Sequence, residues 1–375
     1  MDENVSAQGN ESAEPADSPR PPDPPEPTPT EGAPDPATRR RRPAGHRRKR
    51  RRLPLWVAVV GWIVLLPLAV VALMRIVAWD YFEIFAVINT VSLFVYLPAW
   101  VVAIVAGIGR RFVLAAAALL IVVAQLIFVL PEFTAAQPAP RWAAAAPSLR
   151  LLDANVYDDN PTSMSGYASE IKSYRPELVT MEEATPFLVE QLQQAGALVR
   201  LPFDYEVSRD DPEAFLVASK YRLSGSHVVF FGGFPLIVQT TIHLPSGPEP
   251  LWVVHTTAPL PSAFGLWKGQ LALIAKLVEE RGPHRLLLVG DFNATWGNKG
   301  FRSILGDGMT DGAAARARPF EMTWSQIKHP LPPLVRIDHV LTGPGVAVTT
   351  IRTDVGPGSD HRDLMATIAF QPRHT

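Results

Sequence analysis

The chain has 375 residues, of which 47% are hydrophobic and 19% charged, and its formal net charge is −1. Because it contains no cysteine, a disulfide framework, a thiolate nucleophile, an iron–sulfur cluster and a zinc–thiolate site are excluded. Any catalytic metal must therefore be held by oxygen or imidazole ligands. The near-zero charge is an average over segments of very different composition, which follow one another along the chain.

Residues 1–52 are predicted to form a disordered leader that ends in an arginine-rich flank. Residues 1–38 carry ten prolines and nine acidic side chains without an apolar run, so they cannot bury enough surface to offset the entropy of ordering. Ten Lys and Arg then lie between residues 39 and 52. Nucleic-acid binding and a targeting signal are alternatives for this basic block, but its position directly before Leu53 favours the cytoplasmic flank of a membrane helix.

Three apolar runs without charged residues predict transmembrane helices over about 53–74, 84–108 and 112–131. Each run has the roughly 20 residues needed to cross the hydrocarbon core of a bilayer. The alternative, three buried helices of a soluble domain in series, would require polar faces that these runs lack. A cleaved signal peptide is disfavoured, because the first run begins after fifty residues and two more follow it.

The positive charges predict how these helices are oriented in a cell membrane. The second connection is Arg110–Arg111, whereas the first connection carries one basic and two acidic residues. The positive-inside rule then places the N-terminus in the cytoplasm and everything after Glu132 outside the membrane. Residues 132–147, rich in proline and alanine, are predicted to be a linker.

Residues 148–372 are predicted to form one α/β domain. The apolar run Leu149–Val156, a helical pattern over Ser165–Tyr174 and the run Leu178–Met181 alternate strand, helix and strand. Several closely spaced runs between residues 215 and 255 predict an antiparallel stretch. Apolar positions over Phe264–Arg281 recur at helical spacing, with Gly282 as the stop. Further strands are predicted at 286–289, 335–341, 346–351 and 364–370. This pattern is typical of a layered α/β sandwich.

Five of these apolar runs end in, or carry near an end, a polar residue able to bind metal or transfer protons. These residues are Asn155, Glu183, His255, Asp291 with Asn293, and Asp338. A further cluster, Asp360 with His361, comes just before the last run. Turn chemistry or surface exposure explains any one of them, but together they favour a shared site, since ligands bind α/β sheets at strand ends. Asp338 stands inside an apolar run and needs a partner, for which an imidazole is a good candidate.

Six motifs in order over residues 149–370 resemble the endonuclease/exonuclease/phosphatase superfamily: LLDANV, LVTMEE, VVHTTAP, LVGDFNA, RIDHVL and GSDH. This superfamily includes deoxyribonuclease I, apurinic endonucleases, neutral sphingomyelinases and inositol polyphosphate phosphatases. The resemblance implies a deoxyribonuclease I-like, four-layer α/β/β/α sandwich. With three transmembrane helices before it, the chain resembles a membrane-anchored bacterial type of this superfamily.

The resemblance also implies catalytic roles for five residues. Asp291 and Asn293 would position the attacking water and the phosphate. His361, oriented by Asp338, would contact the phosphate or transfer a proton. His255 falls where the nuclease and sphingomyelinase branches carry a histidine that protonates the leaving oxygen.

For the metal, the resemblance implies that Glu183 with Asn155 holds Mg²⁺ or Mn²⁺, with Asp360 nearby. Glu182 stands where the family usually has glutamine, and the flanking residues favour Glu183 over Glu182 as the ligand. Glu213 resembles the usual carboxylate partner of the proton-donating histidine.

The expected function is that of a membrane-anchored, metal-dependent phosphoesterase acting outside the cytoplasmic membrane. The globular segment from residue 147 onward holds 20 Lys and Arg against 24 Asp and Glu, so it lacks the basic surface that tight binding of long nucleic acid requires. Lipid headgroups, envelope phosphodiesters and extracellular nucleic acid all remain possible substrates, and the lipid bilayer is the expected partner. The alternative is a non-catalytic envelope protein that keeps the fold for binding or scaffolding. The presence of every essential group favours the enzyme.

Overall fold

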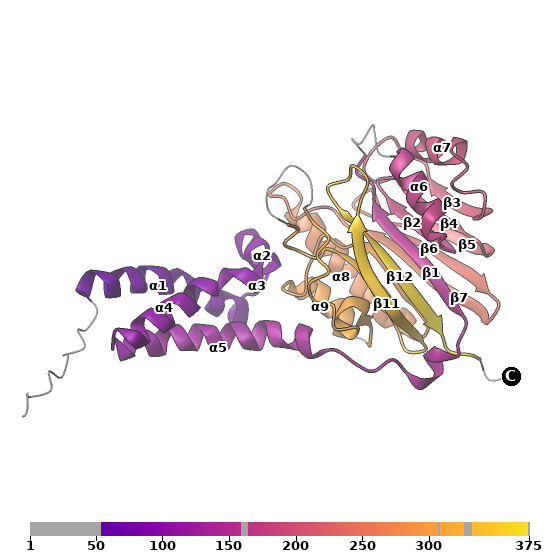
Figure 1. The fold of residues 1–375 in the computed structure, drawn as a ribbon. Helices are drawn as coiled ribbons and strands as arrows, with labels where there is room; N and C mark the ends of the chain where they lie inside the picture. Colours follow the sequence, from indigo (N-terminus) through magenta and orange to yellow (C-terminus); the bar gives the residue numbers. More distant parts are fainter. Residues whose placement is uncertain (1–53, 159–163, 307, 326–331, 374–375) are drawn as a thin grey trace, which may run out of the picture. The chain divides into compact units, whose positions relative to one another are not determined.

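The computed structural model describes residues 54–158, 164–306, 308–325 and 332–373. The predicted leader and basic block, residues 1–52, lie outside the described residues. Figure 1 shows the described part as an N-terminal group of helices and a C-terminal domain built on two sheets.

The helical block, residues 54–134, contains two unbroken helices that are long and apolar enough to cross a membrane. They are α1 (Leu55–Val77) and α5 (Phe112–Thr134). The run predicted as a straight helix over 84–108 is broken instead. It forms α2 (Glu83–Thr90), α3 (Ser92–Val95) and α4 (Leu97–Ile108), and the chain turns by 81° at the break.

The break between α2 and α3 lies at polar residues, which a hydropathy average over the whole run conceals. Asn89 and Thr90 close α2, and Ser92 opens α3. The Thr90 hydroxyl donates a hydrogen bond to the carbonyl of Ala86 at 3.1 Å, and Ala86 itself is buried in an apolar cluster of the C-terminal domain. Because α2 packs on the domain, a third membrane crossing would have to be made by α3 and α4.

Helices α1 and α5 run parallel to each other. Near the start of both helices, Gly61 lies against the side chain of Leu114. Near the end of both, the guanidinium carbon of Arg75 lies 4.8 Å from the centre of the Phe128 ring. The chain must therefore return along the block between the end of α1 and the start of α5, and residues 92–108 make that return.

The C-terminal domain is built on two six-stranded mixed sheets. The first has the order β11-β12-β1-β2-β4-β3 and the second the order β5-β6-β7-β8-β10-β9. The strands of the first sheet are β1 (Ser148–Asn155), β2 (Leu178–Glu182), β3 (Phe203–Val207), β4 (Phe215–Ser219), β11 (Val346–Val355) and β12 (Arg362–Phe370). Those of the second are β5 (Leu223–Phe231), β6 (Phe234–Leu244), β7 (Gly247–His255), β8 (Leu287–Asp291), β9 (Thr310–Asp311) and β10 (Asp338–Thr342).

Helices cover the outer face of each sheet, so the predicted four layers are confirmed. Helices α6 (Met164–Tyr174) and α7 (Pro186–Gln194) pack on the first sheet, and α8 (Phe264–Arg281) and α9 (Lys299–Gly306) pack on the second (Figure 1). A third apolar cluster fills the space between the sheets. The central strands are buried on both faces, which explains their near-continuous apolar runs. Two short helical segments, η2 (Arg141–Ala144) and α10 (Gly312–Ala315), complete the domain.

Helix α8 follows the predicted pattern. Trp267, Leu271, Ile274 and Val278 are all buried on its inner face. The helix ends at Gly282, whose φ of +77° lies in the left-handed region that favours glycine. The antiparallel stretch predicted between residues 215 and 255 is also present, because β5, β6 and β7 pair in antiparallel order.

Candidate active site

Strand pairing places three polar side chains in one row at the end of the second sheet. Parallel pairing of β7 with β8 sets His255 opposite Asp291, and antiparallel pairing of β8 with β10 sets Asp338 opposite Asp291. In the first sheet, β1 ends at Asn155 and Glu183 directly follows β2. The amide of Asn155 joins the two sheets, since its Nδ2 donates to Glu183 Oε1 at 2.9 Å and to Asp291 Oδ2 at 3.2 Å.

The consecutive glutamates at the end of β2 point in different directions. Glu183 has a φ of +60°, and its carboxylate also accepts a hydrogen bond from the backbone N–H of Asp158 at 3.1 Å. Glu182 is fully buried and neither of its carboxylate oxygens has a hydrogen-bond partner among the described residues. It faces Gly290 of β8, where a Cβ atom would come within 2.8 Å of Glu182 Oε1. Glu183 therefore belongs to the site, and Glu182 to the interior between the sheets.

His361 and Asp338 form a buried ion pair. The Nδ1 atom of His361 lies 2.9 Å from Asp338 Oδ2, so the predicted imidazole partner is present. Burial alone would lower the pKa of His361, but the Asp338 carboxylate outweighs it and raises this pKa to about 10. Burial alone would raise the pKa of Asp338, but the charge of His361 and its hydrogen bond hold that pKa below its usual value. The pair is therefore imidazolium and carboxylate at neutral pH.

Asp291 is held by the loop that follows it. The backbone N–H of Asn293 donates to Asp291 Oδ1 at 2.7 Å, and Asn293 Nδ2 contacts Asp291 Oδ2 at 3.1 Å. Asn293 adopts a φ of +45°, and its Nδ2 also donates to the carbonyl of Thr256 at 2.8 Å. Burial, followed by the charge of Asp338, raises the pKa of Asp291 well above its usual value. The same Oδ2 of Asp291 lies 3.9 Å from His361 Nε2.

His255 is a neutral imidazole in this setting. Its Nε2 lies 3.6 Å from Glu183 Oε1 and 3.9 Å from Asp291 Oδ2. Burial and the positive charge of His361 lower the pKa of His255 to about 4. The backbone of Pro212 partly offsets this lowering of the pKa. The carboxylate of Glu213, which resembles the usual partner of this histidine, lies 3.7 Å from Arg209 Nη2.

Asp360 lies at the rim of the site. Its Oδ2 accepts a hydrogen bond from Trp324 Nε1 at 3.0 Å, and its Oδ1 lies 3.9 Å from His361 Nε2. Trp324, at 41% exposure, forms part of the rim and was not indicated by the sequence pattern.

Two buried hydroxyls that the sequence analysis did not single out also support the site. Ser359 Oγ donates to the carbonyl of Asn155 at 2.7 Å and accepts from the backbone N–H of His361 at 3.0 Å. Thr323 Oγ1 accepts from the backbone N–H of Asp338 at 3.2 Å. Ser359 belongs to the GSDH motif, so its position next to two candidate residues was the available signal.

One cavity of about 430 Å³ collects these groups. Glu183, His255, Asp291, Asn293, Asp360 and His361 line it, together with Tyr157 and Trp324. Asn155 and Asp338 lie behind this lining and contact it through the hydrogen bonds above. The structure thus brings all eight sequence-predicted residues together.

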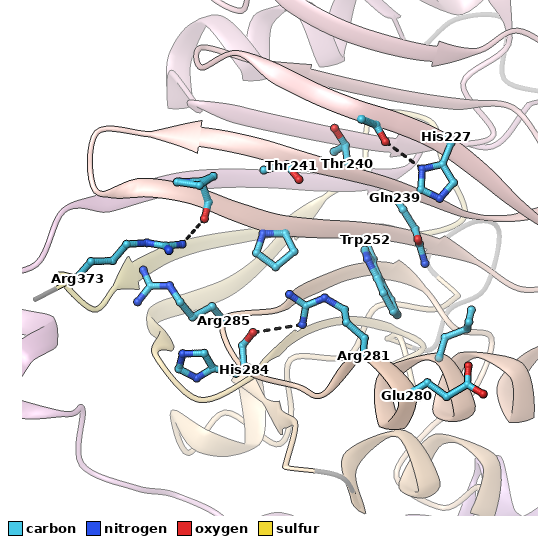
Figure 2. A pocket seen from close by; sticks show the side chains of 14 residues that line it. His227, Gln239, Thr240, Thr241, Trp252, Glu280, Arg281, His284, Arg285 and Arg373 are labelled. Atoms are coloured by element: carbon cyan, nitrogen blue, oxygen red, sulfur yellow. Dashed lines mark hydrogen bonds between the residues drawn. The ribbon is translucent and has the colours of Figure 1, made fainter. Parts of the chain in front are cut away.

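A larger cavity of about 730 Å³ lies elsewhere on the second sheet and contains none of them (Figure 2). Its cationic side chains already bind protein groups. Arg285 pairs with the buried Glu249, and Arg281 donates to the carbonyl of His284. Arg373 donates to the carbonyl of Pro248. We therefore place the candidate active site in the smaller, carboxylate-rich cavity.

The oxygen ligands of this cavity fit a divalent metal ion. Ligand atoms of Asp291, Asp338 and His361 all lie within 4.8 Å of one another and could bind one, although a histidine in its imidazolium form is not a ligand. The carboxylate of Glu183 lies beside this group, and Asn155 Nδ2 donates to both Glu183 and Asp291. Burial raises the pKa of Glu183, and Glu183 in turn contributes to the raised pKa of Asp291. Such a group of hard oxygen atoms is what Mg²⁺ and Mn²⁺ prefer.

Comparison with known proteins identifies the class. Residues 154–361, more than half of the chain, match the sequence profile of the Endonuclease/Exonuclease/phosphatase family. The chain belongs to this family, and the predicted deoxyribonuclease I-like α/β fold is confirmed. A comparison with curated protein sequences gives no significant match.

Several solved structures are similar to this chain. A humanized TDP2 from D. rerio is 19% identical, with a TM-score of 0.48, and the match covers 59% of this chain and 98% of that one. A family protein from Bacteroides vulgatus is 17% identical, with a TM-score of 0.48 and coverages of 60% and 99%. The 3′ phosphatase NExo from Neisseria, bound to a product DNA hairpin, is 15% identical, with a TM-score of 0.46 and coverages of 58% and 98%.

Proposed function

We propose that the protein is a membrane-anchored, divalent-metal-dependent phosphoesterase that hydrolyses a phosphodiester or phosphomonoester outside the cytoplasmic membrane. The observation that carries this proposal is the convergence of Glu183, Asp291 and the Asp338–His361 ion pair on one cavity. Phosphate esters resist attack because their oxygens are already negative, so hydrolysis needs cationic groups at the phosphate and an oriented water. The cavity offers a cationic side chain, His361, and a carboxylate, Asp291, that can orient a water.

In this proposal Glu183 and Asn155 would hold the metal ion, with Asp360 nearby, and a bound ion would supply positive charge that offsets the negative charge of the phosphate. Its ligands are oxygen atoms, so Mg²⁺ or Mn²⁺ is the expected metal. The placement rests on the 2.9 Å contact between Asn155 Nδ2 and Glu183 Oε1 and on the position of Asp360 at the cavity rim.

The remaining side chains orient the reacting groups. His361, kept protonated by Asp338, donates a hydrogen bond to a phosphate oxygen. Asp291 accepts a proton of the attacking water, and its raised pKa makes it a stronger base than an ordinary aspartate. Asn293 fixes the Asp291 carboxylate. The neutral His255 lies near both carboxylates. When an anionic phosphate raises its pKa, His255 takes up a proton from solvent and passes it to the leaving oxygen.

Metal dependence provides the direct test. We expect the full chain in detergent micelles to hydrolyse bis(p-nitrophenyl) phosphate with Mg²⁺ or Mn²⁺, to lose activity in chelator, and to regain it when metal is restored. Asp291→Asn is the inactive control. Failure to hydrolyse both this diester and p-nitrophenyl phosphate at any metal concentration would instead support the non-catalytic binding or scaffolding function.

The substrate class follows from a panel assay. The domain has no excess of basic side chains, with 20 Lys and Arg against 24 Asp and Glu from residue 147 onward, so long duplex DNA is expected to be a poor substrate. A panel of phospholipids, nucleotides, and single- and double-stranded DNA separates lipid headgroups and envelope phosphodiesters from nucleic acid.

The location outside the membrane is supported by the parallel arrangement of α1 and α5. If α1 and α5 both cross the membrane in the same direction, the chain must cross back between them. With α3 and α4 as that return, the block crosses the membrane three times. The ten Lys and Arg of residues 39–52 then favour a cytoplasmic N-terminus. We expect alkaline phosphatase fused after Thr375 to be active and a fluorescent protein fused there to be dark. The reverse pattern would refute this topology.

A further inference from the structure

The end of α1 and the connection that follows it bind the loop that leads away from the active site. Arg75 Nη1 and Trp79 Nε1 both donate to the carbonyl of Gly297, at 2.6 and 2.8 Å. The backbone N–H of Lys299 donates to Asp80 Oδ2 at 2.5 Å. Three side chains of the helical block thus bind the turn at Gly297 and the first residue of α9, only a few residues after Asn293.

Helix α2 binds the same loop from a second direction. Asn298 Nδ2 donates to the carbonyl of Ala86 at 3.0 Å, and Thr295 Oγ1 donates to the carbonyl of Thr90 at 3.1 Å. Ala86 is fully buried in the apolar cluster that contains Phe292. The helical block therefore contacts the loop between Asn293 and α9 both through hydrogen bonds and through apolar packing at Ala86.

The contact is a buried polar network. Exposure is 3% for Arg75, 6% for Asp80 and 2% for Asn89. Asn89 links the other two, because it accepts from Arg75 Nη1 at 3.1 Å and donates to Asp80 Oδ1 at 2.8 Å. Buried polar groups are costly without partners, and here several of the partners belong to the domain. A domain on a freely moving tether would leave these groups unsatisfied.

Gly297 shows how closely the two parts approach. A Cβ atom at this position would lie 1.8 Å from the carbonyl oxygen of Asn89, so only glycine permits the contact. Gly306, at the end of α9, has no atom within 4 Å of an added Cβ and provides a matched control in the same domain.

The end of α5 makes a second contact, on the strand that carries Asp338. Glu132 Oε1 accepts from Arg336 Nη2 at 2.6 Å, and the same nitrogen donates to Asp311 Oδ2 at 3.1 Å. Arg336 is 4% exposed and stands two residues before Asp338. The helical block therefore binds the segment after Asp291 and the segment before Asp338. These segments adjoin β8 and β10, which pair with each other in the second sheet.

From these contacts we propose that the ends of α1, α2 and α5 are positioning elements of the active centre. Asp80, Asn89 and Glu132 fix the two segments that set the separation of Asp291, Asn293 and Asp338. This inference rests on the proposed phosphoesterase function. It implies that residues 135–147 do not act as a flexible tether, and that the domain depends on the helical block for its full turnover rate.

The test uses the full chain in lipid nanodiscs with two contact variants, two control variants and two substitutions of Glu132. Asp80→Ala and Gly297→Ala disturb the contact, whereas Gly306→Ala does not approach it. Gln125→Ala removes hydrogen bonds with Trp100 and Leu93 that stay inside the helical block. Hydrogen exchange over residues 291–300 and the steady-state constants for bis(p-nitrophenyl) phosphate are measured for each variant.

Both contact variants are expected to exchange faster in this segment and to lose at least about tenfold in kcat, with KM changed by less than about twofold, because small misplacements of reacting groups reduce turnover strongly. The two control variants should match wild type. Glu132→Ala is expected to lower kcat likewise, and Glu132→Gln to restore most of it, since the amide oxygen still accepts from Arg336.

Wild-type exchange in both contact variants, or faster exchange with unchanged kcat, would overturn the inference. If wild type is active and Asp291→Asn is inactive, either of these outcomes refutes the positioning role and leaves the proposed phosphoesterase function standing. An inactive wild-type protein would refute the proposed function itself.

Discussion

Asp291→Asn and His361→Asn are each expected to lower kcat by at least about a hundredfold, the lower end of what positioned proton transfer contributes. Asp291 is the candidate base, and the amide cannot accept the proton of a water. His361 supplies the positive charge that Asp338 keeps in place. Because His361 Nε2 lies 3.9 Å from Asp291 Oδ2, the two side chains are close enough to act on one phosphate.

The double variant distinguishes a shared site from two separate ones. Groups that work as a unit lose far less on the second substitution than on the first, so the double variant should be scarcely slower than the slower single variant. Circular dichroism controls for folding. Multiplication of the two losses, or near-full activity of either single variant, would contradict the shared site.

Glu183→Gln is expected to abolish metal-dependent turnover while the fold is retained. Its carboxylate lines the cavity and contacts Asn155 at 2.9 Å, and an amide is a much weaker ligand for a hard cation. Calorimetric titration of Mg²⁺ into the full chain measures the loss directly. Equal Mg²⁺ affinity in wild type and variant would place the metal elsewhere.

Glu182→Gln is the matched control one residue away, and it should keep both metal affinity and activity. Burial raises the pKa of Glu182 well above its usual value, with the Asp153 charge adding to the effect. An acid with a raised folded-state pKa destabilises the fold increasingly as pH rises above its unfolded pKa of about 4.3. The glutamine variant should therefore unfold at the same temperature as wild type near pH 4 and at a higher temperature at pH 7.

Much of the candidate site could be predicted because strand ends carry a local signal. A buried strand that stops at Gly290 and continues with Asp291 and Asn293 indicates where the carboxylate lies, whatever the rest of the chain does. Asp338 could be predicted to need a partner because it stands in an apolar run. The register that sets Asp291 opposite His255 and Asp338 depends on pairing across the sheet, and no local pattern contains it.

The structure of the helical block could be predicted only in part from the apolar composition of its segments. Hydropathy predicts that residues 84–108 are apolar enough to cross a membrane, but it averages over Asn89, Thr90 and Ser92, where the chain bends by 81°. The contact of Arg75 with Gly297 joins residues more than two hundred positions apart. Arg75 alone could be taken for an ordinary charged end of a membrane helix, and its partner is known only from the fold.

The Asp338–His361 pair also determines how the active centre responds to its surroundings. The pKa of Asp338 lies below its usual value, so this carboxylate loses its charge only below the pH at which an ordinary aspartate does, and His361 loses its charge only near pH 10. Across the wide interval between them, the positive charge offered to a phosphate stays constant. The electrostatic attraction between His361 and a phosphate is therefore the same in mildly acidic and mildly alkaline medium. Changes in turnover with pH over that interval must come from the other titratable groups of the cavity.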